Sequence, residues 1–278
     1  MCEMNDYVHK ISADESIRIR RFLRRFAAGA VAFVLIVVLA IVFADRWILI
    51  VSSDAERRFI EPYVQWADEH LQYRGNPDLQ AYVTDLAQQI AADMDVGDGL
   101  QLDFRVVNGA EANAFTTVGG YVYVFEGLLR GLESENSLAM VLAHEIAHAR
   151  SRDPLLAASR GMLLQLVISQ LSGAGVDPGT VDTGSSLVLN SYNREQEEAA
   201  DLAALAALQK RYGHIGGATG FFEALIASGE APQTVDVLST HPNLASRVAY
   251  IESTAQGKGW RTGATTPYPP EIISILRN

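Results

Sequence analysis

Residues 138–153 read LAMVLAHEIAHARSRD, and this stretch decides what kind of fold the chain can build. Two histidines, His144 and His148, stand four residues apart in a segment that is otherwise mostly apolar or small. On an α-helix that spacing is slightly more than one turn, so both imidazoles leave the same face. The apolar residues around the pair predict a helix that is buried inside a domain rather than solvated.

The two histidines have the spacing of a metal site. Neutral imidazole nitrogens one turn apart can bind one Zn²⁺, each at about 2.1 Å. Glu145 lies about 100° further round the helix, so it is close to the metal but badly placed to be a ligand. It can instead accept a proton from a metal-activated water and return it to a leaving group. The alternative is a surface helix with incidental polar residues, and the apolar flanks argue against it.

A reactive metal site needs a third protein ligand and an open position. No histidine stands six residues after His148, so the third ligand must lie elsewhere. Residues 193–201 read NREQEEAAD and offer carboxylates at helical spacing. Glu197 and Asp201 share a helix face, so the first can bind metal while the second holds a ligand histidine. Spacing alone leaves Glu197 and Glu198 open as the ligand.

Charge is distributed unevenly along the 278 residues. The net charge is −11 in total, but residues 1–25 hold six basic and four acidic residues and carry about +2. The remainder has 22 − 6 = 16 basic and 33 − 4 = 29 acidic residues, about −13. Such an acidic domain has no electrostatic basis for binding nucleic acid, and we exclude that class of function. The single Cys2 excludes an internal disulfide and a cysteine metal cage.

An uncharged run from Phe26 to Ala44 predicts a transmembrane helix, because its 19 residues can span a hydrocarbon core of about 30 Å. The run is longer than the core of a signal peptide, although a cleaved signal and a buried helix remain as alternatives. By the positive-inside rule the N-terminus is cytoplasmic. We therefore expect a single-pass inner-membrane protein whose main domain faces the periplasm. Five arginines precede the run: Arg18, Arg20, Arg21, Arg24 and Arg25.

The chain divides into three expected parts: a basic segment at 1–25, a transmembrane helix at 26–46 and one domain at 47–278. A second apolar stretch, Leu155 to Leu171, contains Arg160, which is costly inside a membrane. We expect it to be a buried helix or to line a groove near the membrane, with a second span as the alternative.

The pattern of the domain predicts a mainly α fold with a small β-sheet (α+β). Asn76-Pro77 ends the first of its helices, and Asp78 is the expected cap of the next. The sequence predicts helices at 54–73, 79–94, 134–151, 187–208, 221–228 and 243–254, strands at 100–107, 112–117 and 121–125, a loop at 173–186, and an extended tail from 257.

Residues 112–125 have the pattern of a β-hairpin around Gly119-Gly120. One interpretation is an exposed edge strand that pairs with an extended substrate; the other is a purely structural hairpin. The first interpretation makes four residues candidates for substrate binding: Gly120, Tyr121, Val122 and Tyr123.

Four pieces of the chain together resemble a known family. They are ANAFTTVGGYVYVFEGLL (112–129), LAMVLAHEIAHARSRD (138–153), NREQEEAAD (193–201) and THPNLASRVAYI (240–251). In this order they resemble the HtpX and Ste24-type zinc metallopeptidases, most of all periplasmic relatives of the BepA and LoiP kind. The resemblance covers roughly residues 105–251. The family pattern Arg-x-x-Glu-x-x-Ala-Asp is met by Arg194, Glu197, Ala200 and Asp201.

The resemblance implies a zincin-like (gluzincin) domain in which His144, His148 and Glu197 hold one Zn²⁺ and Glu145 is the general base. It places His241 near the metal, either to stabilise an oxyanion or to fill the open position in a latent state. It also suggests that Arg194 pairs with a carboxylate or helps to position the site. The chain departs from the family pattern in having asparagine at position 193, where serine is common.

The implied activity is a zinc-dependent endopeptidase that hydrolyses misfolded or misassembled envelope and membrane proteins. Protein and peptide substrates, and a membrane bound through one helix, are the expected partners. The alternative is an assembly factor that grips client strands and cleaves them rarely or never. A structural zinc module is a further alternative, but it would leave Glu145 without a purpose.

Overall fold

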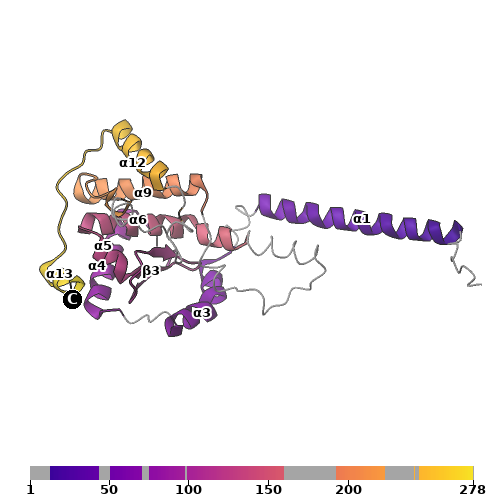
Figure 1. Cartoon of the computed structure of the whole chain (residues 1–278), viewed down its shortest axis with the longest axis horizontal. Coiled ribbons are helices and arrows are strands. Elements are labelled where there is room, and N and C mark those ends of the chain that lie inside the picture. Colours follow the sequence, from indigo (N-terminus) through magenta and orange to yellow (C-terminus); the bar gives the residue numbers. More distant parts are fainter. Residues whose placement is uncertain are drawn as a thin grey trace, which may run out of the picture.

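The structure is a computed structural model. It describes residues 13–43, 51–70, 75–97, 99–159, 192–222, 241 and 244–277. Figure 1 shows a long N-terminal helix, α1, standing apart from the other elements, which pack together in layers. The mainly helical fold with one small sheet confirms the predicted fold class.

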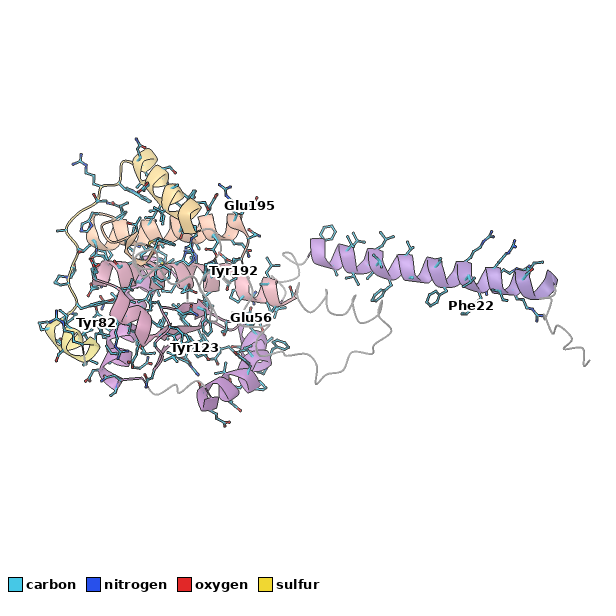
Figure 2. The ribbon with its side chains drawn as sticks, viewed as in Figure 1. Phe22, Glu56, Tyr82, Tyr123, Tyr192 and Glu195 are labelled. Atoms are coloured by element: carbon cyan, nitrogen blue, oxygen red, sulfur yellow. The ribbon has the colours of Figure 1, made fainter. Side chains whose placement is uncertain are left out.

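The helix α1 (Ala13–Val42) contains the expected apolar run as far as Val42 but begins earlier, so that the preceding arginines are helical as well. Its large apolar side chains are mostly exposed, Phe22 for example by 68% (Figure 2). Among the described residues it is the one helix long and apolar enough to cross a membrane. A soluble helix would not leave such a surface unburied, so α1 has the character of a membrane anchor.

The next two helices flank the predicted break at Asn76-Pro77. The helix α3 (Ser53–His70) precedes it, as expected, and α4 (Pro77–Asp93) follows it. The expected cap Asp78 is wrong. The side chain of Asn76 caps α4 by accepting hydrogen bonds from the backbone N–H groups of Asp78 and Leu79, at 2.8 and 3.3 Å. Pro77 suits the first turn, where its missing N–H has no partner to lose.

Three strands form the sheet: β1 (Asp103–Val107), β2 (Ala114–Thr116) and β3 (Tyr121–Phe125). Their order is β1-β3-β2; β1 runs parallel to β3, whereas β2 and β3 form the predicted antiparallel hairpin. Gly119 and Gly120 make the turn with φ of 83° and 79°, a region that only glycine adopts easily.

The central position of β3 corrects one expectation. Its backbone pairs with β1 on one side and β2 on the other, so Gly120–Tyr123 cannot offer an open edge to a substrate. Within the part of the chain that the structure describes, the unpaired edge of the hairpin belongs to β2.

Side chains of β3 alternate between two packed faces. Val122 and Val124 face the main core, which α4 and α6 cover. Tyr121 and Tyr123 face a second cluster, which contains Ile60 and Val64 of α3. Helices therefore cover both faces of the sheet, as Figure 1 shows with α3 opposite α6.

The quoted stretch forms α6 (Glu135–Ser151), and the whole run from Asn136 to Ala149 is buried. Ser134 caps its start by accepting a hydrogen bond from the backbone N–H of Ser137. Arg152 ends it in the left-handed conformation, with φ of 57°. Residues 153–159 are again helical; the remainder of the apolar stretch to Leu171, and the loop predicted at 173–186, lie outside the described residues.

Two further helices complete the layers: α9 (Arg194–Tyr212) packs on α6, and α12 (Leu244–Lys258) packs on α9 (Figure 1). Asn193 caps α9 in a capping box with Gln196, which explains why α9 begins there and not at 187. The sequence did not predict α5 (Glu126–Gly131) or α13 (Pro270–Leu276). The helix expected at 221–228 is described only as far as 222.

Candidate metal centre

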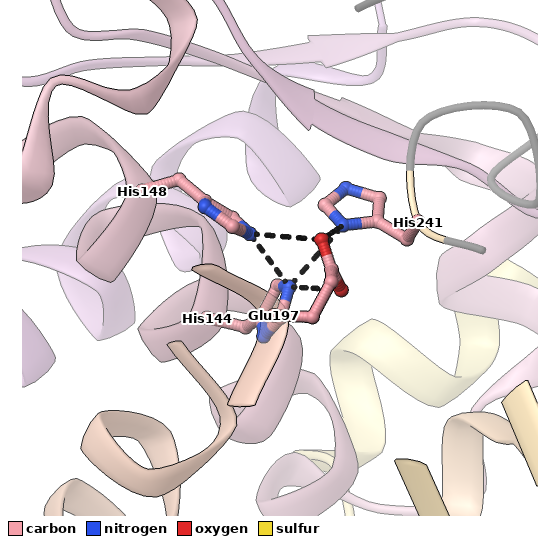
Figure 3. Close-up of side chains that lie close together, drawn as sticks. All are labelled: His144, His148, Glu197 and His241. Carbon is pink, nitrogen blue, oxygen red and sulfur yellow. Dashed lines mark hydrogen bonds and ion pairs between the residues drawn. The ribbon is translucent and has the colours of Figure 1, made fainter. Parts of the chain in front are cut away.

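Four side chains converge in the interior of the domain; two come from α6, one from α9 and one from the segment just before α12. They are His144, His148, Glu197 and His241 (Figure 3). Each is at most 5% exposed, so water contributes little to their solvation. One donor atom from each lies within 4.8 Å of the others. A buried set of three imidazoles and a carboxylate is chemically a metal-binding set.

Distances within the cluster fit one small cation. The Nε2 atoms of His144 and His148 lie 3.0 Å apart, and Nδ1 of His241 lies 3.3 Å from Nε2 of His144. Glu197 Oε1 lies 2.8 Å from His241 Nδ1 and 3.5 Å from His148 Nε2. Ligand atoms around a tetrahedral Zn²⁺ are about 3.3 Å apart. The separations scatter around that value.

Two carboxylates outside the cluster set the tautomer of the two histidines on α6. Nδ1 of His148 lies 2.8 Å from Asp153, and Nδ1 of His144 lies 3.0 Å from Asp201. Each Nδ1 therefore carries the proton and donates it to its carboxylate, which leaves a lone pair on each Nε2. Two such lone pairs 3.0 Å apart need a proton or a metal ion between them, and the residues present fit a metal ion.

Arg247 on α12 connects Asp201 with the carboxylate of Glu197. Its guanidinium donates to both oxygens of Asp201, at 2.6 and 2.9 Å, and its Nη1 lies 2.8 Å from Oε2 of Glu197. Both carboxylates are buried, and a fixed guanidinium can hold two such groups in orientation. Glu197 Oε2 is thus engaged by Arg247, which leaves Oε1 facing the imidazoles.

Burial and neighbouring charged or polar groups both shift the pKa values of the donors. Burial lowers the pKa of His144, and nearby Arg247 lowers it further. Burial also disfavours charge on His148, but its bonds to Asp153 and Glu197 outweigh this and raise its pKa to about 9. Burial raises the pKa of Glu197, yet hydrogen bonds from His148 and His241 bring it well below its ordinary value. Without a bound metal ion, the site therefore favours an ionised Glu197 beside a positively charged His148, and a metal cation would take the place of that proton.

Glu145 lies beside the cluster and is 2% exposed. The hydroxyl of Thr116 on β2 lies 2.9 Å from its Oε2, and Nε2 of His241 lies 3.5 Å from its Oε1. One carboxylate oxygen is thus fixed by the sheet while the other points towards the cluster. This is the geometry that a general base next to a metal ion requires.

Tyr192 covers the cluster from the segment that leads into α9. Its ring stacks on that of His148, with centroids 4.0 Å apart and planes 22° apart. Its hydroxyl donates a long hydrogen bond of 3.5 Å to the backbone carbonyl of Thr116. Tyr192 therefore joins the metal centre to the unpaired edge of β2.

A pocket adjoins the metal centre at His144, Glu145 and His241. Apart from the polar groups of the centre, its walls are apolar: Ala114, Met140, Val141, Phe221 and Phe222.

Most residues expected at the site are together in the structure: His144, Glu145, His148, Glu197, Asp201 and His241. Arg194 is not among them, because its side chain is 77% exposed and pairs with Glu198. Sequence reasoning overlooked Asp153, Arg247, Thr116 and Tyr192. Arg247 and Asp153 nevertheless stand inside the quoted pieces 240–251 and 138–153, at positions whose partners only the fold reveals.

Together, the helical fold and the buried His-Glu set with a carboxylate beside it define a zincin-like metal centre. Comparison with known families agrees: the model of peptidase family M48 matches residues 74–255, more than half of the chain. The chain belongs to peptidase family M48.

Three relatives illustrate the similarity. The mitochondrial metalloendopeptidase OMA1 of Schizosaccharomyces pombe is 31% identical over 180 residues, which cover 62% of this chain and 51% of that protein. The beta-barrel assembly-enhancing protease of Escherichia coli is 29% identical over 160 residues, 52% of this chain and 33% of that protein. Metalloprotease YcaL of Escherichia coli is 28% identical over 178 residues, 58% and 65% respectively. The chain thus spans about half of the first relative and a third of the second.

Proposed function

We propose that this protein is a zinc-dependent endopeptidase anchored in a membrane. The observation that carries the proposal is the pair of imidazole Nε2 atoms that face Glu197, with Glu145 fixed beside them. Nitrogen and carboxylate donors in near-tetrahedral separation suit Zn²⁺ among the common biological cations. A bound Zn²⁺ supplies a Lewis acid that makes water nucleophilic near neutral pH.

Glu145 would accept a proton from the attacking water on the oxygen that faces the cluster, and later deliver it to the leaving amine. Thr116 holds the other oxygen, so the base cannot rotate away from the reaction centre. His241 presents Nε2 towards Glu145, where a protonated imidazole could stabilise the oxyanion of the attacked carbonyl.

His241 also gives the resting centre a fourth donor, because its Nδ1 lies among the other ligand atoms. A catalytic zinc site uses three protein ligands and keeps a position open. Turnover would therefore require His241 to move, and the resting enzyme would be latent.

The substrate backbone would pair with β2. In the hairpin, Thr117 N–H bonds to Tyr121 O and Phe125 N–H bonds to Asn113 O, so odd-numbered residues of β2 face β3. In an antiparallel ladder the backbone groups of Ala114 and Thr116 then point outward. An extended peptide bound there would pass Glu145, and the apolar pocket would accept one of its side chains.

The membrane anchor supports a proposal for the class of substrate and for the cellular location of the protein. A tethered peptidase that requires an extended chain would act on misfolded or misassembled proteins close to the membrane. We propose the inner membrane, with the cytoplasmic N-terminus and periplasmic catalytic domain that the arginine distribution indicates. The names of the relatives, which include mitochondrial and beta-barrel assembly-enhancing proteases, support an organelle or envelope setting.

The test compares the full-length chain with two variants in detergent. Glu145→Gln removes the base and keeps the shape, and Glu195→Gln, at an exposed position on α9, is the matched control. With stoichiometric zinc in all three, we expect the parent and Glu195→Gln to cleave casein equally. Glu145→Gln should lose about 10²–10⁴-fold in kcat. Equal turnover by the parent and Glu145→Gln would contradict the proposal.

The fourth donor His241 favours a second candidate, an assembly factor that binds client strands and seldom cleaves them. In that case the zinc-loaded parent would bind unfolded protein through β2 with no turnover. A slow His241→Ala enzyme and an inactive parent would instead indicate latency, because removal of the fourth donor opens the metal.

A further inference from the structure

The helix α3 lies outside the family match at 74–255 and directly follows the membrane segment. We propose that α3 is a positioning element of the metal centre, and that Glu56 is the positioning residue through which it acts. In this view the anchored end of the chain holds the general base and a metal ligand in place. The activity readout below rests on the proposed function; the structural readouts do not.

Glu56 joins two segments that are distant in sequence. Its side chain is buried, with 6% exposure (Figure 2). One carboxylate oxygen pairs with the guanidinium of Arg152, the residue that ends α6. The other accepts a hydrogen bond of 3.3 Å from the backbone N–H of Gly119, in the turn of the hairpin. A single carboxylate thus ties the end of α6 to the tip of the sheet.

Arg57 adds a second contact between α3 and the turn at Gly119. Its Nε donates to the carbonyl of Gly119 at 2.9 Å, and its guanidinium lies 4.6 Å above the ring of Tyr121. A Cβ at Gly119 would come within 3.2 Å of Ile60 and 3.3 Å of Arg57. Both backbone groups of Gly119 are therefore held by α3, with no space left between helix and turn.

The two residues that Glu56 contacts, Gly119 and Arg152, are close in sequence to residues that hold Glu145 and His148. Gly119 is three residues from Thr116, whose hydroxyl holds the carboxylate of Glu145. Arg152 immediately precedes Asp153, whose carboxylate fixes the tautomer of His148. Glu56 thus acts on the general base through β2 and on a metal ligand through Asp153. A displacement of about 1 Å at such groups can cost about 10²-fold in rate.

Arg152 extends the connection towards the membrane. Besides Glu56, it donates a hydrogen bond of 2.6 Å to the backbone carbonyl of Val51. The segment that leaves the anchor is thus bonded to the same guanidinium that ends the metal-binding helix. Ile60 and Val64 pack α3 against the face of the sheet that carries Tyr121 and Tyr123.

The experiment uses the full-length chain in lipid nanodiscs, loaded with zinc. Glu56→Gln keeps an acceptor for Gly119 but removes the charge that pairs with Arg152, whereas Glu56→Ala removes both contacts. Asp54→Asn, at an exposed position in the same first turn, is the matched control. The measurements are kcat and KM on a peptide, hydrogen exchange of residues 114–120, and the rate of zinc release to a chelator.

We expect kcat to fall about tenfold in Glu56→Gln and about a hundredfold in Glu56→Ala, with KM changed less than about threefold. Hydrogen exchange at 114–120 and zinc release should both accelerate in the same order. Arg152→Lys, which keeps the charge, should retain most of the parent's kcat. Asp54→Asn should match the parent throughout.

Unchanged exchange and zinc release in Glu56→Ala would overturn the inference, as would a loss of global stability with parental kcat in the folded fraction. If neither the parent nor His241→Ala showed turnover, the peptidase proposal would be refuted and this one would not, because exchange and zinc release still report whether Glu56 positions the hairpin and His148.

Discussion

At the scale of single residues, the metal centre depends on which carboxylate faces inward. Glu197 and Glu198 are neighbours on α9, yet Glu197 is 2% exposed within the cluster while Glu198 pairs with the exposed Arg194. We therefore expect Glu197→Gln to lose bound zinc and Glu198→Gln to keep one equivalent per chain. The glutamine amide is a poor zinc ligand, and glutamine has nearly the same side-chain volume as glutamate. Metal analysis after dialysis decides this; loss of zinc only in Glu198→Gln would show that the assignment is wrong.

Tyr192→Phe removes one atom at the edge of β2 where we propose that substrate binds. The hydroxyl of Tyr192 occupies the carbonyl of Thr116, which points outward from β2 and which a substrate N–H would need. We expect Tyr192→Phe to raise kcat/KM on an extended peptide about two- to fivefold, mainly through KM, since one weak hydrogen bond no longer competes. Zinc content should stay the same, because the phenyl ring still stacks on His148.

The contrasting variant is Tyr192→Leu, which removes the ring as well. It should release zinc faster than Tyr192→Phe does. A fall in kcat/KM for Tyr192→Phe would indicate that the hydroxyl assists the reaction, and would contradict the competition described here.

Residues of the site differ in how far the sequence could predict them. His144, Glu145 and His148 follow from helical periodicity, because their relation is local. Thr116 and Arg247 meet the centre from positions 29 and 103 residues away from their partners on α6. Such contacts depend on tertiary packing, and no periodic pattern encodes them. The family resemblance supplied Glu197 and His241, whose contacts with α6 are also long-range.

At the scale of the elements, Glu135 ties α6 to α4 and α9. Its two oxygens accept hydrogen bonds of 3.0 Å from Tyr82 and Tyr212. Tyr268, at the start of the C-terminal helix region, lies edge-on against Tyr82 with centroids 6.0 Å apart. Burial, and then the charge of Glu135, raise the pKa of all three tyrosines above the ordinary value of 10.0.

This cluster predicts a loss of stability in alkali. Because the folded-state pKa values of these tyrosines are raised, the unfolded chain releases their protons first, so their contribution to the free energy of unfolding is constant below about pH 10 and falls above it. Tyr268→Phe should make that decline shallower. At neutral pH it should be neutral or slightly stabilising, since the buried hydroxyl has no hydrogen-bond partner among the described residues. Urea unfolding from about pH 7 to about pH 11 measures both effects.

The control is Tyr250→Phe, on the partly exposed face of α12. It should reproduce the parental pH profile. A Tyr268→Phe profile as steep as the parent's would show that the hydroxyl of Tyr268 does not contribute to the decline.

Element boundaries illustrate a different limit of sequence reasoning. Asn193 with Gln196 and Asn76 with Pro77 are local signals, and they set the starts of α9 and α4. The short helix α13 begins at Pro270, whose run of prolines predicted only an extended tail. It is a helix because Ile272 is buried in the core, a tertiary contact that outweighs a weak local preference.

At the scale of the whole molecule, the orientation of α1 decides which proteins the metal centre can meet. Five arginines precede the apolar run, so the K/R bias predicts a cytoplasmic N-terminus. The one cysteine of the chain, Cys2, belongs to the N-terminal segment and makes the orientation measurable. In spheroplasts of a Gram-negative host, we expect a membrane-impermeant maleimide to leave Cys2 unlabelled until the cells are lysed. Cys2→Ser combined with Ala264→Cys, at an exposed position of the catalytic domain, should be labelled without lysis. The reverse pattern would put the metal centre in the cytoplasm and exclude envelope proteins as its substrates.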